Sequence, residues 1–246
     1  MEWSESGTVL GAKRHGEANL ILEVMTRDRG RHLGLVRGGR SRRMAALLQV
    51  GNALTLTWRA RLHEHLGLFQ VDGERLRGGF LMERPEALLA AQLCATHLRL
   101  VPERDPHPRL YDLMELILDH PDERLTLGAL VARFELTLLE ELGFGLDLSC
   151  CAATGAQDDL VFVSPKSGRA VSAQAGEPYK AKLLKLPAFF RGSLETCDSA
   201  ALGDAFRLTA FFLDRNVWAP RGLAPPDGRD GLLRRLLAQE TPVEAE

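Results

Sequence analysis

Seven arginines stand in the segment 27–43, RDRGRHLGLVRGGRSRR, with Asp28 as its single acidic residue. Exposed protein surfaces normally carry both positive and negative charges, whereas this segment carries almost only positive charge. Guanidinium groups bind phosphate oxygens well, and the four glycines of the segment let its backbone turn sharply or come close to a ligand. The segment is therefore a candidate for contact with a polyanion, and a solvated face without any partner is the alternative.

Residues 34–41, GLVRGGRS, nearly match the phosphate-binding loop of nucleotide hydrolases, but Arg40 stands where that loop carries its lysine. In those enzymes the lysine reaches the terminal phosphates and a helix begins where the loop ends. Here the match falls in a region of alternating strand patterns. No later strand stands out that ends in an aspartate able to hold a metal ion. These departures argue against nucleotide hydrolysis.

The chain contains four cysteines: Cys94, Cys150, Cys151 and Cys197. They are too few and too irregularly spaced for a disulfide framework. A zinc ribbon needs two Cys-x-x-Cys pairs, but the position that would complete the first pair is Thr154, and the later segment offers Ser172 and Ala175. We therefore expect no bound metal and no cofactor. No Ser/His/Asp set or carboxylate pair can be assembled either, so the chain is not expected to be an enzyme.

Five short runs of alternating apolar and polar residues lie between Gly7 and about Leu76: TVLGAKRH, NLILEVMT, RHLGLV, ALTLTWRAR and GLFQVDGERL. This alternation is typical of five strands, and RRMAALLQ between the third and fourth is typical of a short helix. Five strands with a helix in that position predict an OB-fold barrel over residues 1–80. Trp58 and Phe69 either stack on bases or fill the core of the barrel.

After Pro85 the apolar period becomes helical. Residues 147–176 are rich in Gly, Ser and Asp and contain a short strand pair, LVFVS and GRAVS. The predicted fold class is therefore α+β: a five-stranded OB-fold barrel over residues 1–80, then a helical bundle over 81–246 with a small β insertion at about 147–176. A frayed tail is expected at the C-terminal end. The predicted helices span residues 86–101, 109–119, 127–142, 178–190, 199–216 and 229–239.

Charge is divided unevenly along the chain. Residues 1–80 contain 13 basic and 8 acidic residues, whereas the remainder contains 18 and 25. This asymmetry predicts a polyanion partner for the barrel alone. No apolar run approaches the roughly 20 residues that cross a bilayer, and no secretory signal is visible at the N-terminus. We therefore expect a cytoplasmic protein with no membrane partner.

The charge cluster and the predicted barrel together favour nucleic acid as that partner. In OB folds the second and third strands and the adjoining loops receive oligonucleotides, and the arginine segment runs through that face into the next loop. Because phosphates carry no sequence information, no base specificity is expected. An OB-fold RNA-binding module is the alternative to a DNA-binding one. The residues expected to contact DNA are Lys13, Arg14, Arg31, Arg37, Arg40, Arg42 and Arg43.

Longer patterns carry a resemblance to a known family. VLGAKRHGEANLILEVMTRDRGRHLGLVRGGRSRR, then EHLG, LLEELGFGLDL, and SPKSGRAVS followed by YKAKLLKLP closely resemble the RecO family of bacterial DNA-repair and recombination mediators, over about residues 5–215. The resemblance implies an N-terminal OB fold, a helical bundle and a small knuckle near its end. Many family members hold zinc there with four cysteines, and this sequence departs from that pattern.

The same resemblance implies a non-enzymatic function. It implies binding of single- and double-stranded DNA, annealing of complementary strands, and loading of RecA, together with RecR, onto strands coated by single-strand-binding protein. Contact with the acidic C-terminal tail of that coat protein is implied for the helical region, and a cytoplasmic, nucleoid-associated location for the protein.

Overall fold

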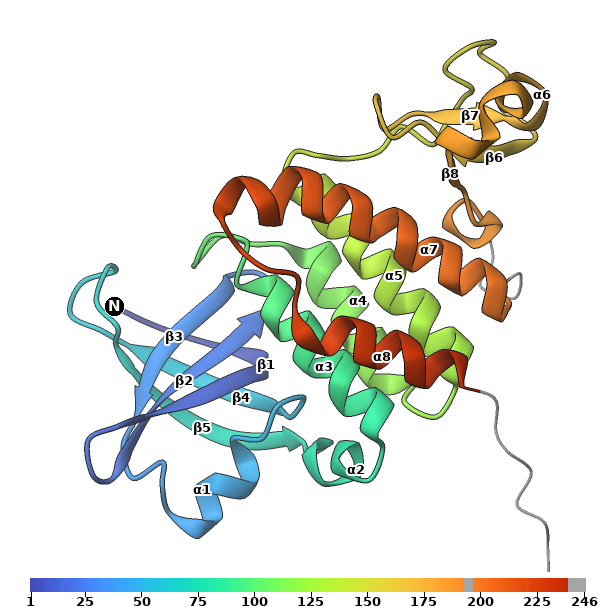
Figure 1. Ribbon diagram of the computed structural model, residues 1–246. Coiled ribbons are helices and arrows are strands. Elements are labelled where there is room, and N and C mark those ends of the chain that lie inside the picture. Colours follow the sequence, from blue (N-terminus) through green and yellow to red (C-terminus); the bar gives the residue numbers. More distant parts are fainter. Residues whose placement is uncertain (193–196, 239–246) are drawn as a thin grey trace, which may run out of the picture. The chain divides into compact units, whose positions relative to one another are not determined.

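The computed structural model describes residues 1–192 and 197–238, so the tail expected from Gln239 onward lies outside the described residues. The chain divides into two compact units, Met1–Asp122 and Glu123–Glu246. The first unit holds the strands β1–β5 and the helices α1–α4, and the second holds the helices α5–α8 and a small sheet (Figure 1).

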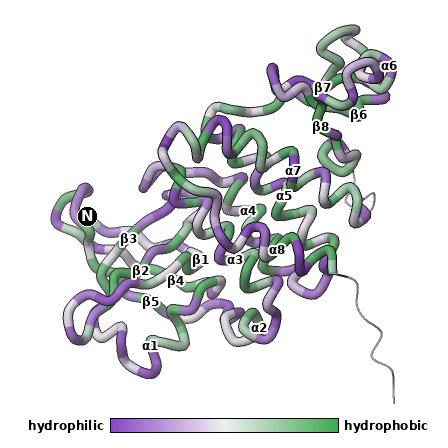
Figure 2. The backbone as a smooth tube through the Cα atoms, in the orientation of Figure 1, coloured by the Kyte–Doolittle hydropathy of each residue, from purple (hydrophilic) through white to green (hydrophobic). Residues whose placement is uncertain are grey.

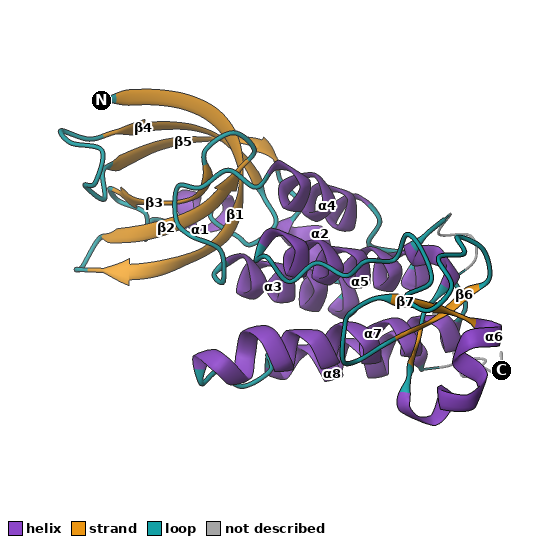
Figure 3. Cartoon of the chain, turned by 90° about the horizontal axis from the view of Figure 1, so that it is seen from above, coloured by secondary structure: helices purple, strands orange, loops and turns teal. Residues whose placement is uncertain are grey.

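A closed five-stranded barrel forms the N-terminal part of the first unit (Figure 3). Its strand order is β1-β2-β3-β5-β4, and β4 pairs back onto β1. Only β3 and β5 run parallel, where Leu35 pairs with Leu68. A short helix, α1 (Arg42–Leu47), connects β3 to β4. The predicted OB-fold barrel is therefore confirmed. Its strands are β1 (Glu2–His15), β2 (Asn19–Thr26), β3 (Gly30–Val36), β4 (Ala53–Arg59) and β5 (Leu68–Arg75).

Alternation along the strands fills the barrel with apolar side chains. On β4, Leu54, Leu56 and Trp58 point inward and are fully buried, as strand periodicity requires. Phe69 of β5 is 4% exposed, and Gly34 leaves room for its ring, since a Cβ at residue 34 would lie 2.4 Å from it. Of the two roles open to Trp58 and Phe69, the structure gives both rings the core role. Figure 2 shows hydrophobic colour along the strands and hydrophilic colour at many loop tips.

An ion-pair network joins the barrel to the next helices of the same unit. Arg77, which is 7% exposed, donates hydrogen bonds of 2.8 Å to both Glu115 and Asp119. Thr8 of β1 donates to Glu115 at 2.5 Å. Hydrogen bonds to charged groups are stronger than neutral ones, so the network fixes the last helix of the unit against the strand ends. The domain boundary expected at residue 80 stays a prediction. The helices are α2 (Gly78–Met82), α3 (Pro85–Leu98) and α4 (Pro108–Asp119).

The second unit is built around a buried ion pair. Glu135, fully buried on α5, accepts hydrogen bonds of 2.7 and 2.8 Å from Arg229 of α8. Thr209 of α7 donates to the same carboxylate at 2.5 Å. Because an unpartnered buried charge costs several kcal/mol, the pair fixes the three helices relative to one another. They are α5 (Arg124–Glu141), α7 (Ser199–Leu213) and α8 (Asp227–Leu237), with a π-helical turn, Asp214–Trp218, after α7.

A small three-stranded sheet of order β7-β6-β8 belongs to the second unit. We call residues 147–186, which contain this sheet, the knuckle. The helix predicted over 178–190 is wrong: a 3-10 helix, Glu177–Lys182, is followed by β8, which pairs with β6. Lys, Ala and Leu favour helices, but the prolines at 178 and 187 leave too short a segment between them, and pairing with β6 outweighs propensity. The elements are β6 (Leu160–Val163), β7 (Ala170–Ser172), α6 (Ala173–Gly176) and β8 (Leu184–Lys185).

A buried histidine sits within the aromatic part of the barrel core. His32 of β3 is 2% exposed, and its ring centroid lies 5.1 Å from those of both Trp3 and Trp58. Burial, together with the nearby positive charge of Arg104, lowers the pKa of His32 to about 4. The imidazole is therefore neutral in the folded protein at neutral pH.

This burial predicts that the free energy of unfolding falls as the pH drops from about 6.5 to about 4. In that window the unfolded chain protonates His32 near its ordinary pKa of about 6.5, whereas the folded chain keeps it neutral until about 4. The unfolded state then binds more protons, so acid favours it. The variant His32→Phe keeps an aromatic ring without titrating and should flatten this part of the profile. Denaturant titrations from pH 7 to 4 measure both proteins, and parallel profiles would contradict the assignment.

Candidate nucleic-acid interface

The seven arginines of segment 27–43 fall into two groups, of which the first is partnered by acids. Arg27 donates hydrogen bonds of 2.9 and 3.0 Å to the two oxygens of Asp112. The guanidinium of Arg31 lies 3.0 Å from Glu23, and its side chain is only 14% exposed. Arg29 also faces a carboxylate, at a longer distance of 3.6 Å. Arg31 was expected to contact DNA. Its contact with DNA stays a prediction. The guanidinium of Arg31 already has an acidic partner, which it would have to give up to bind phosphate.

The second group consists of four arginines in residues 37–43, which we call the arginine loop. All four are exposed, and none forms an ion pair with a residue that the structure describes. The guanidinium of Arg40 donates only to the backbone carbonyl of Glu17. Their charges are therefore available to a ligand. The four are Arg37, Arg40, Arg42 and Arg43.

Backbone hydrogen bonds hold the arginine loop against the turn between β1 and β2. The amide of Arg40 donates to the carbonyl of Ala18 at 3.1 Å, and the amide of Gly38 donates to the side chain of Asn19 at 3.1 Å. Gly38 has a φ of +62°, a left-handed conformation that glycine adopts without strain. The path of the loop is thus fixed mainly by its backbone, and its arginine side chains form no ion pair with a residue that the structure describes.

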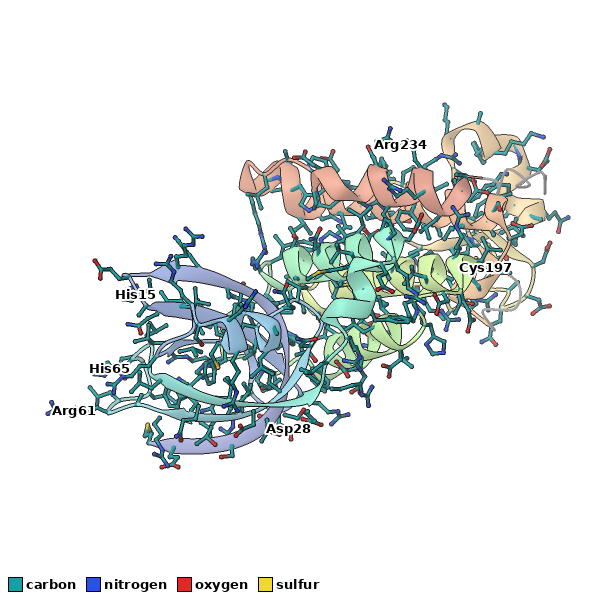
Figure 4. The ribbon with its side chains drawn as sticks, turned by 90° about the horizontal axis from the view of Figure 1, so that it is seen from below. His15, Asp28, Arg61, His65, Cys197 and Arg234 are labelled. Atoms are coloured by element: carbon teal, nitrogen blue, oxygen red, sulfur yellow. The ribbon has the colours of Figure 1, made fainter. Side chains whose placement is uncertain are left out.

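Strand register brings Lys13 and Arg14 to the same end of the barrel. Arg14 of β1 pairs with Leu20 of β2, which in turn pairs with Val36 of β3, the residue before Arg37. Both Lys13 and Arg14 are exposed. Figure 4 shows the next residue, His15, at the outer tip of this strand. Six of the seven residues expected to contact DNA therefore gather at one end of the barrel, and Arg31 is the exception.

Arg42 and Arg43 lie in the first turn of α1, and that turn contains no acidic residue. The N-terminal end of a helix carries partial positive charge, so acids stabilise it and cations do not. None of the residues of α1 is buried. These two arginines therefore oppose helix stability and do not pack, which is consistent with a requirement for positive charge at this surface.

A groove of about 610 Å³ adjoins the arginine loop, between α1 and the outer faces of β4 and β5. Arg37 and Met44 line one part of it, and Thr55, Thr57 and Arg59 of β4 line another. The β4 residues were not expected as site residues. The alternation ALTLTWR contains the only signal for them, because the residues between the buried Leu54, Leu56 and Trp58 must point outward.

The resemblance of residues 34–41 to a phosphate-binding loop does not extend to the fold. The segment covers the end of β3 and a turn in a largely antiparallel barrel, and the helix after it has only 6 residues. A nucleotide-hydrolase loop instead joins a strand of a parallel sheet to a longer helix. The arginine loop is therefore a different structure.

Hydroxyl groups lie around Cys151, one of the two cysteines of the knuckle that could contribute to a zinc site. Cys151 is 1% exposed, and the backbone amide and hydroxyl of Ser172 lie 3.3 and 3.5 Å from its sulfur. Hydrogen bonds from Ser172 and Thr154 lower the pKa of Cys151 to about 6. The sulfur of Cys150 lies 3.8 Å from Arg169. Within the described ranges, no three His, Cys, Asp or Glu side chains gather as metal ligands, so this donor set does not fit zinc.

A closed five-stranded barrel with a helix between its third and fourth strands, followed along the chain by a helical unit that carries a small sheet, defines a protein with an N-terminal OB fold. Models for the N-terminal and C-terminal parts of recombination protein O match residues 1–72 and 83–222. The chain belongs to the RecO family of DNA repair proteins. The resemblance inferred from the sequence motifs is therefore confirmed.

Individual relatives cover nearly the whole chain. The DNA repair protein RecO of Mesorhizobium japonicum is 55% identical to it, over 96% of this chain and 94% of the relative. The proteins of the same name from Chelativorans sp. and Rhizobium johnstonii are 55% and 54% identical, over 96% and 99% of this chain and 96% and 95% of the relatives. Among the described residues, no helix is long and apolar enough to cross a membrane.

The donor set of the knuckle predicts that the purified, tag-free protein contains no stoichiometric zinc. Cys151 has hydroxyl groups where a structural site needs thiolates, and hydroxyls are poor ligands for this ion. Elemental analysis after dialysis measures the metal content directly. One zinc per chain would contradict the prediction.

The arginine loop predicts a specific change in the salt dependence of DNA binding. Each phosphate contact on a single strand contributes about 0.7 to the slope of log affinity against log salt. Replacing Arg40, Arg42 and Arg43 by alanine should therefore flatten the slope by roughly 2, equally for unrelated sequences. Salt titrations on two oligonucleotides measure the slope, and circular dichroism checks folding.

A matched triple variant controls for the loss of charge as such. Arg207, Arg234 and Arg235 are exposed on α7 and α8 (Figure 4 shows Arg234), so their replacement removes the same charge from the second unit. This control should keep the wild-type slope. An unchanged slope in the folded arginine-loop variant would mean that the loop is only a solvated surface.

Proposed function

We propose that this protein binds single- and double-stranded DNA through the arginine loop, Lys13 and Arg14, and that it catalyses no reaction. The observation that carries the proposal is the set of four exposed arginines without acidic partners at one end of an OB-fold barrel. Their side chains would contact phosphates, so the binding would not depend on base sequence. The names of the relatives, DNA repair protein RecO, support DNA as the nucleic acid.

Annealing of complementary strands follows from the same chemistry. Two polyanions approach one another only if their repulsion is cancelled, and cationic side chains do so while releasing condensed counterions. A surface that supplies charge without reading bases leaves the base edges free to pair. We therefore propose that the protein accelerates annealing.

We propose that this activity serves a cellular role that requires partner proteins. Family membership supports cooperation with RecR in loading RecA onto strands coated by single-strand-binding protein, in the cytoplasm at the nucleoid. The barrel carries the excess of positive charge, and the remainder of the chain is acidic. We propose that the barrel holds DNA, while the helical part docks proteins, including the acidic tail of the coat protein.

Strand annealing with and without single-strand-binding protein tests the proposal. We expect faster pairing of complementary oligonucleotides than in buffer alone, persisting when the strands are coated, and no release of phosphate from nucleotides. The arginine-loop variant should lose most of this acceleration. Pairing at the buffer rate by folded wild-type protein would contradict the proposal, and tighter binding of a matched RNA in competition would favour an RNA-binding module instead.

A further inference from the structure

The knuckle carries a second cluster of positive charge. The net charge of residues 81–246 does not show it, because that part of the chain is acidic as a whole. Four of the five lysines of the chain fall within residues 166–185. Over residues 160–192, six basic side chains stand against one acid, Glu177. Elsewhere the protein uses arginine almost exclusively, so this cluster is distinct in composition as well as in position.

Ion pairs neutralise only part of this cluster. Lys180 lies 2.5 Å from Glu177, and Lys185 lies 3.4 Å from Asp204 of α7. Arg169 likewise pairs with an aspartate. Lys166 and Lys182 form no ion pair with any residue in the described ranges. Among the lysines of the cluster, these two are therefore the ones whose charge is available to a ligand. Arg191, which also forms no ion pair with a described residue, donates to the backbone carbonyl of Gln157.

Both unpaired lysines line one open groove of about 480 Å³ in the knuckle. Small apolar side chains, among them Ala152, Val171 and Leu183, form much of its lining. The ring of Tyr179, which is 62% exposed, lies at the same groove. Tyr179 and Lys182 are three residues apart in a 3-10 helix, so they share one face of it. Lys166 comes from the turn between β6 and β7.

An open cationic groove with an exposed aromatic ring matches the way proteins bind single-stranded nucleic acid, in which bases stack on the ring and cations follow the phosphates. The apolar lining offers few hydrogen-bonding groups to base edges, so stacking here would tolerate any sequence. An acidic peptide would use the same lysines, but an anchoring side chain of a protein partner requires a more enclosed pocket than this open groove. The geometry favours a nucleic acid strand.

We propose that the knuckle groove binds a second single strand of DNA, with a base stacked on Tyr179 and phosphates bound by Lys166 and Lys182. This inference rests on the proposed function and gives the second strand of an annealing reaction a site of its own. The first strand would occupy the arginine loop of the barrel. With two separate sites, one chain could hold both DNA strands at once, and each strand would be neutralised by its own set of cationic side chains.

The test uses full-length protein with Lys166→Ala/Lys182→Ala and Tyr179→Ala variants. Short thymidine oligonucleotides are titrated by calorimetry, and annealing is followed with labelled complementary strands. We expect the charge variant to weaken the weaker of two binding events and to flatten the salt slope of that event by about 1.4. Tyr179→Ala should weaken that event about fivefold or more, the factor that corresponds to loss of one base–aromatic stack. Both variants should slow annealing while the tighter event remains.

Three controls separate the outcomes. Arg234→Ala/Arg235→Ala removes two exposed charges from α8 outside the groove and should leave both binding events intact. Lys166→Arg/Lys182→Arg and Tyr179→Phe should restore the weaker event. Wild-type protein that binds no DNA would overturn the proposed function itself. Intact annealing and two unchanged binding events in the folded groove variants would overturn this inference alone.

A last arm distinguishes the kind of ligand. A synthetic peptide of alternating glutamate and leucine is titrated into the same proteins. If the groove variants lose affinity for this peptide and keep both DNA-binding events, the groove is a peptide-docking surface and the inference is wrong. Cross-linking of a bromodeoxyuridine oligonucleotide to Tyr179, located by mass spectrometry, gives positive support that charge effects alone cannot produce.

Discussion

Closure of the barrel is the constraint on which the candidate interface depends. β1 pairs with β2 along one edge and with β4 along the other, so a single strand completes the cylinder. Pairing of β2 with both β1 and β3 places the turn after β1 beside the loop after β3, where the amide of Arg40 donates to the carbonyl of Ala18. Closure also encloses the aromatic cluster of Trp3, His32 and Trp58. A barrel opened at β1 would lose both the core and the support of the arginine loop.

Acidic partners divide the arginines of the barrel into those that form ion pairs within the protein and those that are available to a ligand. Surface ion pairs add little stability, but a guanidinium held by a carboxylate must give up that partner before it binds phosphate. Arg27 and Arg31 have such partners, whereas the arginine loop has none. The distinction explains how one basic segment both joins β2 and β3 to their surroundings and presents free charge a few residues later.

The small sheet of the knuckle is built around a buried cysteine. Cys151 is buried among hydroxyl groups, and β6 pairs on both sides, with β7 and with β8. Backbone pairing and apolar packing thus stabilise this sheet, and the absence of bound zinc stays a prediction. The exposed surface of the sheet is then free to carry a lysine-rich groove.

The sequence alone determined the strand and helix periods, the position of the helix between the third and fourth strands, and the cluster of positive charge, because these are local patterns. It could not determine which arginines were free, since Arg31 meets Glu23 only through strand pairing. Glu135 lies within the predicted helix over 127–142, but no local pattern shows that its carboxylate is buried with Arg229, far away in the chain. It also predicted a helix where β8 pairs with β6. In each case a contact between distant residues outweighs local preference, and only the tertiary structure decides such contacts.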